Sequence, residues 1–140
     1  MKSRSPLKAI ILIVFVGALI TGIVLLFSGS KLPAAETPED IKEYLAANGI
    51  ITAGEPLTKE IYIPEEFGEV YERYNELQKE QGFDLSAYRG RNARQYTFPV
   101  ASIKGKIATD TEAHVILCDG FIIGGDVAET AINGKMTGIR

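Results

Sequence analysis

The longest apolar run of the chain lies near its N-terminus. Residues 9–27 contain no charged side chain and one hydroxyl, that of Thr21. As a helix, these nineteen residues extend roughly 28 Å, which is close to the hydrocarbon thickness of a bilayer. Three basic side chains lie within residues 1–8 and only Lys31 follows closely, so the positive-inside rule places residues 1–8 in the cytoplasm. The pattern predicts a single-pass transmembrane helix that anchors the chain in membrane lipid and exports everything after it.

A cleaved signal peptide is the alternative interpretation of this run. The apolar core of a signal peptide spans about 7–15 residues, so the greater length here favours an uncleaved anchor. Residues 28–30 and 33–35 have the small side chains of cleavage sites, and a released form therefore stays open. In either case residues 28–36 are expected to form a polar linker, and residues 37–140 to form one extracytoplasmic domain.

Two segments of the exported part have helical signals. Thr37 suits an N-cap and Pro38 the first helical position, and Asn48–Gly49 provides the stop of a short helix. A longer helix is predicted from Pro64 to Gly82, because apolar side chains recur there every three or four residues. The members of this apolar stripe are Phe67, Val70, Tyr71, Tyr74 and Leu77.

Alternation of apolar and polar positions predicts strands over residues 58–63 and 94–100. The apolar face of the second strand consists of Tyr96, Phe98 and Val100. Pro99 cannot donate a hydrogen bond to a neighbouring strand. The second strand is therefore expected either at an edge of the sheet or bulged near its end.

A β-hairpin is predicted around Asp119–Gly120, a dipeptide typical of two-residue turns with left-handed backbone angles. Its strands are residues 113–118 and 121–127, which are apolar on both faces near the turn, so the hairpin is expected at the centre of its sheet. The expected register pairs Cys118 with Phe121, Leu117 with Ile122, Ile116 with Ile123 and His114 with Gly125.

The order of these elements predicts the fold class. Asn133–Gly134 is a second tight turn, which brings residues 135–139 back alongside the hairpin as a meander. The expected class is α+β. An N-terminal transmembrane helix precedes a two-layer domain in which two helices pack on an antiparallel meander of about four strands.

Three pieces of the chain are specific as a set: the Tyr-x-x-Tyr-Asn-x-Leu-Gln run over residues 71–78, and residues 81–85 and 123–126. On these pieces the chain resembles a bacterial family, domain of unknown function 4830. Where the family pattern has an Asn-Tyr pair, this chain has Ser102–Ile103. The resemblance implies an exported or membrane-anchored domain, found mainly in Gram-positive bacteria. It brings no established activity and hence no catalytic residue.

Composition narrows the chemistry of the domain. The single cysteine, Cys118, excludes an intramolecular disulfide, and with a single histidine, His114, it excludes a structural Cys/His zinc site. A formal net charge of −3 in a domain outside the cell argues against nucleic acid as a partner. We therefore predict no metal, no cofactor and no catalytic residue.

The strongest local candidates for binding are Gly124, Gly125 and Asp126. Glycines within a strand permit close approach of a ligand, and the adjacent carboxylate could bind a cation or act as a base. The structural alternative is that the glycines make room for the long helix or form a bulge.

A second group of candidates is basic. Arg89, Arg91 and Arg94 belong to residues 88–106, a stretch without any acidic side chain. Near a membrane such a patch could bind anionic headgroups or a phosphate-rich wall polymer. The alternative is that the arginines pair with the acidic side chains of the long helix.

Two hypotheses of function follow. The first is a membrane-anchored extracytoplasmic binding or accessory module of the bacterial cell envelope, with an envelope protein or an anionic polymer as partner. The alternative is a small extracytoplasmic hydrolase whose site gathers around Gly124, Gly125 and Asp126 with His114 across the hairpin, although an enzyme is the less favoured reading. Convergence of His114 and Asp126 in a cleft would favour the hydrolase, and a flat, solvated surface would exclude it.

Overall fold

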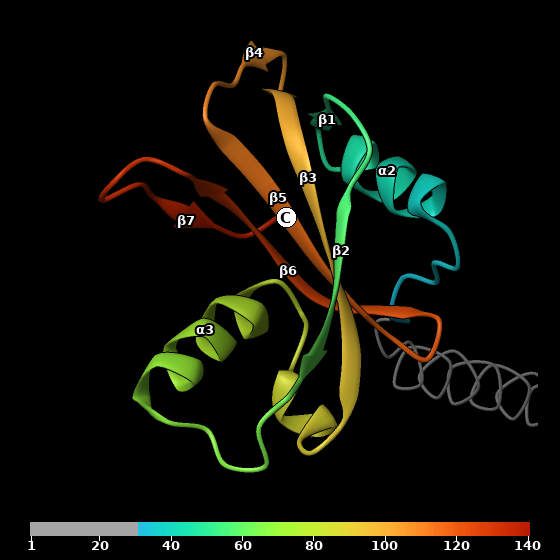
Figure 1. Ribbon diagram of the computed structural model, residues 1–140, viewed down its shortest axis with the longest axis vertical. Coiled ribbons are helices and arrows are strands. Elements are labelled where there is room, and N and C mark those ends of the chain that lie inside the picture. Colours follow the sequence, from blue (N-terminus) through green and yellow to red (C-terminus); the bar gives the residue numbers. More distant parts are fainter. Residues whose placement is uncertain (1–30) are drawn as a thin grey trace, which may run out of the picture. The chain divides into compact units, whose positions relative to one another are not determined.

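The computed structural model describes residues 31–140, so the predicted transmembrane helix over residues 9–27 lies outside the described residues. Within residues 31–140, no helix combines the length and the apolarity needed to cross a membrane. This part of the chain is α+β, as predicted, with two α-helices and one seven-stranded antiparallel sheet (Figure 1).

The elements follow one another along the chain as α2 (Pro38–Ala47), β1 (Ile50–Thr52), β2 (Leu57–Tyr62), α3 (Glu69–Glu80), the 3-10 turn η1 (Leu85–Tyr88), β3 (Asn92–Ile103), β4 (Lys106–Ile107), β5 (Thr111–Cys118), β6 (Phe121–Glu129) and β7 (Met136–Thr137). The main path of the sheet is β1-β3-β5-β6-β7, and β2 and β4 also pair with β3. The predicted number of about four strands was too low. Strands β1 and β4, with three and two residues, are too short to show an alternating pattern.

Pro99 lies where β3 changes partners along one side. Strand β2 pairs with residues 92–97 of β3, and β1 pairs with residues 100–103. The Pro99 carbonyl accepts a hydrogen bond from the Ala53 N–H at 2.8 Å, so the missing N–H of the proline falls between the two partner strands. A register shift in the β1–β3 pairing follows immediately. The sequence left two alternatives for this strand, a place at the edge of the sheet or a bulge near its end. The structure confirms the bulge.

Strands β5 and β6 form the predicted hairpin, and their turn has left-handed angles, with φ of 51° at Asp119 and 77° at Gly120. The two pairs next to the turn are as predicted. Beyond them the predicted register is wrong by one residue, because the β5–β6 ladder contains a bulge at Ile123. Ile116 therefore pairs with Gly124, and His114 pairs with Asp126 rather than Gly125.

The helices lie on opposite faces of the sheet, which makes three layers rather than the predicted two (Figure 1). Val115 packs in the same core cluster as the buried side chains of α2, whereas its neighbour Ile116 packs with Leu85 and the partly buried tyrosines of α3. Successive strand residues face opposite sides, so the two clusters are on opposite faces. Strands that are apolar on both faces must be shielded from water on both faces. Helix α2 covers one face of the sheet, and α3 covers the other.

The short helix α2 is as predicted. Thr37 is its N-cap and forms a capping box with Asp40, and Gly49 ends the helix with a φ of 81°. Ile41 and Leu45 are fully buried against the sheet.

The long helix α3 differs from the prediction in its start and in its buried face. It begins at Glu69 rather than Pro64, because Gly68 is extended at the N-cap and the preceding residues form a loop. The predicted apolar stripe is wrong at Val70, which is 80% exposed, while the buried residues of the helix are Asn75 and Gln78.

Amide side chains hold α3 on the sheet. Gln78 Oε1 accepts a hydrogen bond from the Gly125 N–H at 2.7 Å, and Gln81 Nε2 donates to the Gly125 carbonyl at 2.9 Å. Gln81 Oε1 also accepts from the Ile139 N–H at 2.6 Å. Strand β7 pairs with β6 only beyond Gly125, so the helix amides satisfy backbone groups that a longer strand would have bonded.

Residues 32–35, within the expected linker, pack against the start of β6. The Ala35 N–H donates to the Gly120 carbonyl at 3.0 Å, and the Ile122 N–H donates to the Pro33 carbonyl at 2.8 Å. Ala35 is buried, and Leu32 contacts both core clusters. The chain is thus fixed to the domain from Leu32 onward.

Candidate functional site

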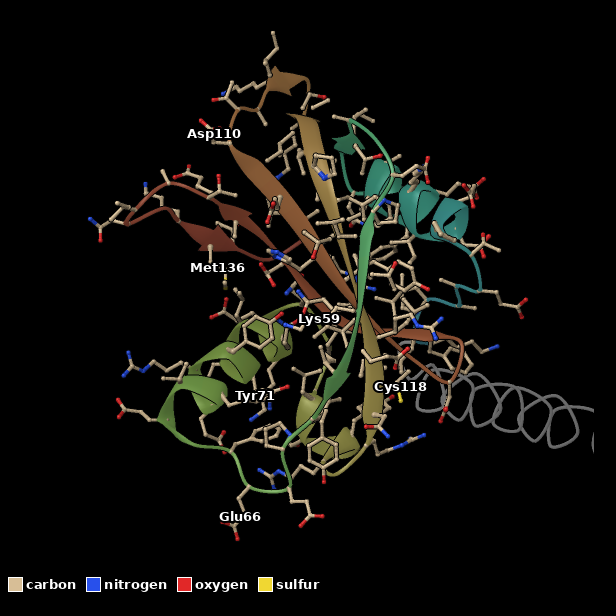
Figure 2. All side chains as sticks on the ribbon, in the orientation of Figure 1. Lys59, Glu66, Tyr71, Asp110, Cys118 and Met136 are labelled. Carbon is tan, nitrogen blue, oxygen red and sulfur yellow. The ribbon has the colours of Figure 1, made fainter. Side chains whose placement is uncertain are left out.

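A pocket of about 400 Å³ lies beside α3 on that helix's face of the sheet. Five strands and the helix contribute to its lining, which consists of Ile61, Tyr62, Tyr71, Tyr74, Gln95, His114, Ile116, Asp126 and Met136. Figure 2 shows Tyr71 of α3 and Met136 of β7 on opposite sides of the space next to α3. The pocket therefore joins segments that are far apart in sequence.

A buried hydrogen-bond network forms one wall of this pocket. The Tyr74 hydroxyl donates to Asp126 Oδ1 at 2.7 Å, and His114 Nδ1 lies 2.9 Å from Asp126 Oδ2. Asp126 is only 2% exposed, so these two partners compensate for the loss of water around its carboxylate. On the other side of the imidazole, Glu112 Oε2 lies 3.4 Å from His114 Nε2.

The network shifts the titration of two of its members. Burial, and after it the Asp126 carboxylate, raises the pKa of the Tyr74 hydroxyl far above its ordinary value, so this group remains a donor at every physiological pH. The hydrogen bond to Asp126 raises the pKa of His114, against the opposing effect of burial, and Glu112 adds to the rise. The environment therefore favours an imidazolium that faces a carboxylate at each ring nitrogen.

The bulge and the two glycines make this geometry possible. The extra residue, Ile123, advances the register so that Asp126 instead of Gly125 lies opposite His114. A Cβ at Gly125 would lie 2.5 Å from the His114 carbonyl oxygen, and one at Gly124 would lie 3.0 Å from Gln78 Oε1. A side chain at Gly124 would thus crowd α3 through Gln78, which is the structural alternative raised for the pair, whereas a side chain at Gly125 would clash with the backbone of β5. Of the three predicted residues, Asp126 alone lines the pocket.

The predicted arginines do not converge on one site. Arg89 lies 3.6 Å from Glu72 of α3, Arg94 lies 2.8 Å from Glu60, and Arg91 pairs with Asp119. Only Arg89 therefore meets the acidic helix. Exposed ion pairs of this kind contribute about 0–1 kcal/mol, so these carboxylates compete only weakly with an external anion. Binding of a polyanion by the three arginines stays a prediction.

The pocket lining consists of groups that are suited to binding a ligand. Its lining includes no serine, threonine, cysteine or lysine, and residues 31–140 contain no cluster of side chains suited to a metal ion. Tyr62 and Tyr71 present aromatic surface. Within residues 31–140, neither the Tyr71 hydroxyl nor the Gln95 amide has a hydrogen-bond partner in the protein. These free groups and ring faces are suited to a ligand that has both hydroxyls and an apolar surface.

Sequence reasoning named His114 and Asp126 but missed Tyr74, which it assigned to the apolar stripe of the helix. Tyr74 and Asp126 are 52 positions apart, and no local pattern links them. The available signal was the Gly124–Gly125 pair, which indicates close approach of another segment without saying which one.

Comparison with known proteins gives one match. The model of a family described as "Domain of unknown function (DUF4830)" matches residues 55–127. The matched region runs from just before β2 into β6, so it includes Tyr74, His114 and Asp126. No curated protein and no solved structure shows significant similarity to the chain.

Proposed function

The chain belongs to the DUF4830 family, and we propose that it is a membrane-anchored extracytoplasmic module that binds a saccharide of the cell envelope in the pocket beside α3. The observation that carries the proposal is the buried Tyr74–Asp126–His114 network, which forms a polar wall in a pocket that is otherwise lined, apart from Gln95, by aromatic and aliphatic side chains. The uncharged run over residues 9–27 supports the anchor.

The balance of charge and apolar surface argues for a neutral, hydroxyl-rich ligand. Asp126 opposes an anion, and both of its carboxylate oxygens are already bonded, to Tyr74 and to His114, so neither is free to bind a cation. The faces of Tyr62 and Tyr71 can cover the C–H surface of a sugar ring, and the Gln95 amide can bond its hydroxyls. A saccharide combines these features.

Calorimetric titration of the full chain in detergent with a tetramer of N-acetylglucosamine tests the proposal. We expect Tyr62→Ala and Gln95→Leu each to weaken binding at least about tenfold, equivalent to about 1.4 kcal/mol. The matched control is Ile51→Ala on β1, because Ile51 is 49% exposed, against 53% for Tyr62, and is absent from the pocket lining. No binding, or binding that survives both pocket variants, overturns the saccharide assignment.

An anionic polymer is the competing partner from the sequence. If polyglycerol phosphate binds instead, and Arg94→Gln weakens that binding while the pocket variants do not, the ligand site is the arginine surface and the pocket proposal is wrong.

A hydrolase is the second candidate, because His114 and Asp126 do lie together in a pocket. Water would then be the nucleophile and His114 its base. The geometry argues against this role, because Nδ1 of His114 faces Asp126 and Nε2 lies 3.4 Å from Glu112, so a carboxylate lies at each ring nitrogen that could bind the water. Release of shorter sugars by the unmodified chain, abolished in His114→Gln with binding retained, would decide for the hydrolase.

Location is tested separately. With the anchor in place, the chain stays in the membrane fraction after carbonate extraction and keeps its full mass of 15.2 kDa. A soluble product shortened by roughly thirty residues would show instead that the run is a cleaved signal peptide.

A further inference from the structure

We infer that one end of the domain rests on the outer surface of the lipid bilayer, with Phe121 inserted among the headgroups. This membrane-proximal end consists of Pro33, Ala34, Arg91 and Phe121. The inference rests on the transmembrane anchor of the proposed function, and it is independent of what the pocket binds.

The attachment of residues 32–35 to the hairpin carries this inference. Ala34 forms a β-bridge with Phe121, and hydrogen bonds on either side of the bridge join the segment to the β5–β6 turn. Figure 1 shows this N-terminal segment, in blue, and the β5–β6 turn at the same end of the sheet. The chain from Leu32 onward therefore cannot serve as a flexible spacer.

The length of free chain sets the distance to the membrane. From Phe27, at the end of the apolar run, to Leu32 there are five peptide steps, which span at most about 18 Å when fully extended. The headgroup layer itself occupies roughly 5–7 Å of that distance. Leu32, and with it the turn to which its neighbours are bonded, is therefore held within roughly 11–13 Å of the outer edge of the headgroups.

The side chains at this end suit a lipid interface. Phe121 is 45% exposed beside the turn, and Arg91 is also exposed. Aromatic side chains favour the headgroup level, and long basic side chains extend from it toward lipid phosphates. The nearby acidic groups are Asp119, which is paired with Arg91, Glu60, which is paired with Arg94, and Glu36. Exposure alone does not single out Phe121, because Leu57, Val70, Ile107 and Ile132 are also exposed. The tether does.

The absence of tryptophan from the chain allows a direct depth measurement. The Phe121→Trp variant of the full chain is placed in vesicles of equal parts phosphatidylglycerol and phosphatidylcholine with brominated acyl chains. The matched control is Ile132→Trp, which is 96% exposed beyond the other end of β6, roughly 26 Å along the strand. We expect bromine to quench the Phe121→Trp variant several-fold more strongly, with a blue-shifted emission, while Ile132→Trp behaves as in water.

Equal quenching of the two variants, or none in either, overturns the inference. Ala34→Trp provides a second probe across the β-bridge, in case Phe121→Trp disturbs the turn, and the same result is expected for it. Carbonate extraction of the same vesicles separates the two proposals. A chain that washes off disproves the anchor, whereas a chain that stays embedded without preferential quenching disproves only the membrane-proximal end.

Discussion

Replacing Tyr74 with phenylalanine removes one hydroxyl from the centre of the candidate site and leaves the ring packing unchanged. The lost group is the donor to Asp126 Oδ1, and Asp126 is 2% exposed, so water does not readily replace it. Loss of a hydrogen bond to a charged, buried acceptor costs about 1.5–3 kcal/mol. Domains of this size have a free energy of unfolding of about 5–15 kcal/mol, so the variant forfeits a measurable share of it.

Urea unfolding of residues 31–140, followed by circular dichroism, measures this cost, because residues 32–140 form one compact unit. Tyr71→Phe is the matched control, one turn earlier on the same helix face and without a hydrogen-bond partner for its hydroxyl within residues 31–140. We expect it to change the free energy of unfolding by less than about 0.5 kcal/mol. Equal effects of the two substitutions would refute the view that Tyr74 stabilises the Asp126 carboxylate.

Three further predictions concern the same region. Because folding raises the pKa of His114 above its ordinary 6.5, its stabilising contribution is complete below that value and is lost as the pH rises through the folded pKa. The stability deficit of His114→Gln should thus be larger at about pH 5.5 than at about pH 8.5, in urea unfolding at both. Gly125→Ala places a Cβ 2.5 Å from a backbone carbonyl and should cost about 2–4 kcal/mol by the same assay, whereas Gly124→Ala, which meets movable side chains, should cost about 1 kcal/mol. A fragment starting at Glu36 should melt several degrees below one starting at Lys31 in a calorimetric scan, because it lacks the segment bonded to the β5–β6 turn.

Local signals in the sequence predicted the local structure well. The caps of α2 and the Asp119–Gly120 turn depend on a few adjacent residues whose backbone preferences act at short range. The bulge in β6 had no such signal. Ile122 and Ile123 are identical in type and both fully buried, so an extra residue there leaves the apolar pattern of the strand unchanged while it shifts every later pair.

The orientation of α3 escaped prediction for a different reason. Periodicity assumes that the buried face of a helix is apolar, whereas Asn75 and Gln78 are buried because their amides bond backbone groups of other segments. Such bonds join residues that are 10 to 58 positions apart, so no fixed spacing in the sequence indicates them. The same limit hid Tyr74 as a partner of Asp126, although Asp126 and His114 were each named.

Three features of β6 act together: its bulge, its Gly124–Gly125 pair and its bonds to the amides of the helix. They shape the pocket beside α3 rather than strengthen the sheet. Glycine within a strand costs about 0.5–1 kcal/mol relative to alanine, and a bulge interrupts the ladder, so both features weaken β6 as a strand. Their joint effect is to let α3 approach β6 while the register turns Asp126 toward His114. That approach brings the Tyr74 hydroxyl to 2.7 Å from the carboxylate and makes α3 a wall of the pocket. The bulge and Gly124 therefore interrupt β6 at the place where it forms, with α3, one wall of the pocket that we propose as the binding site.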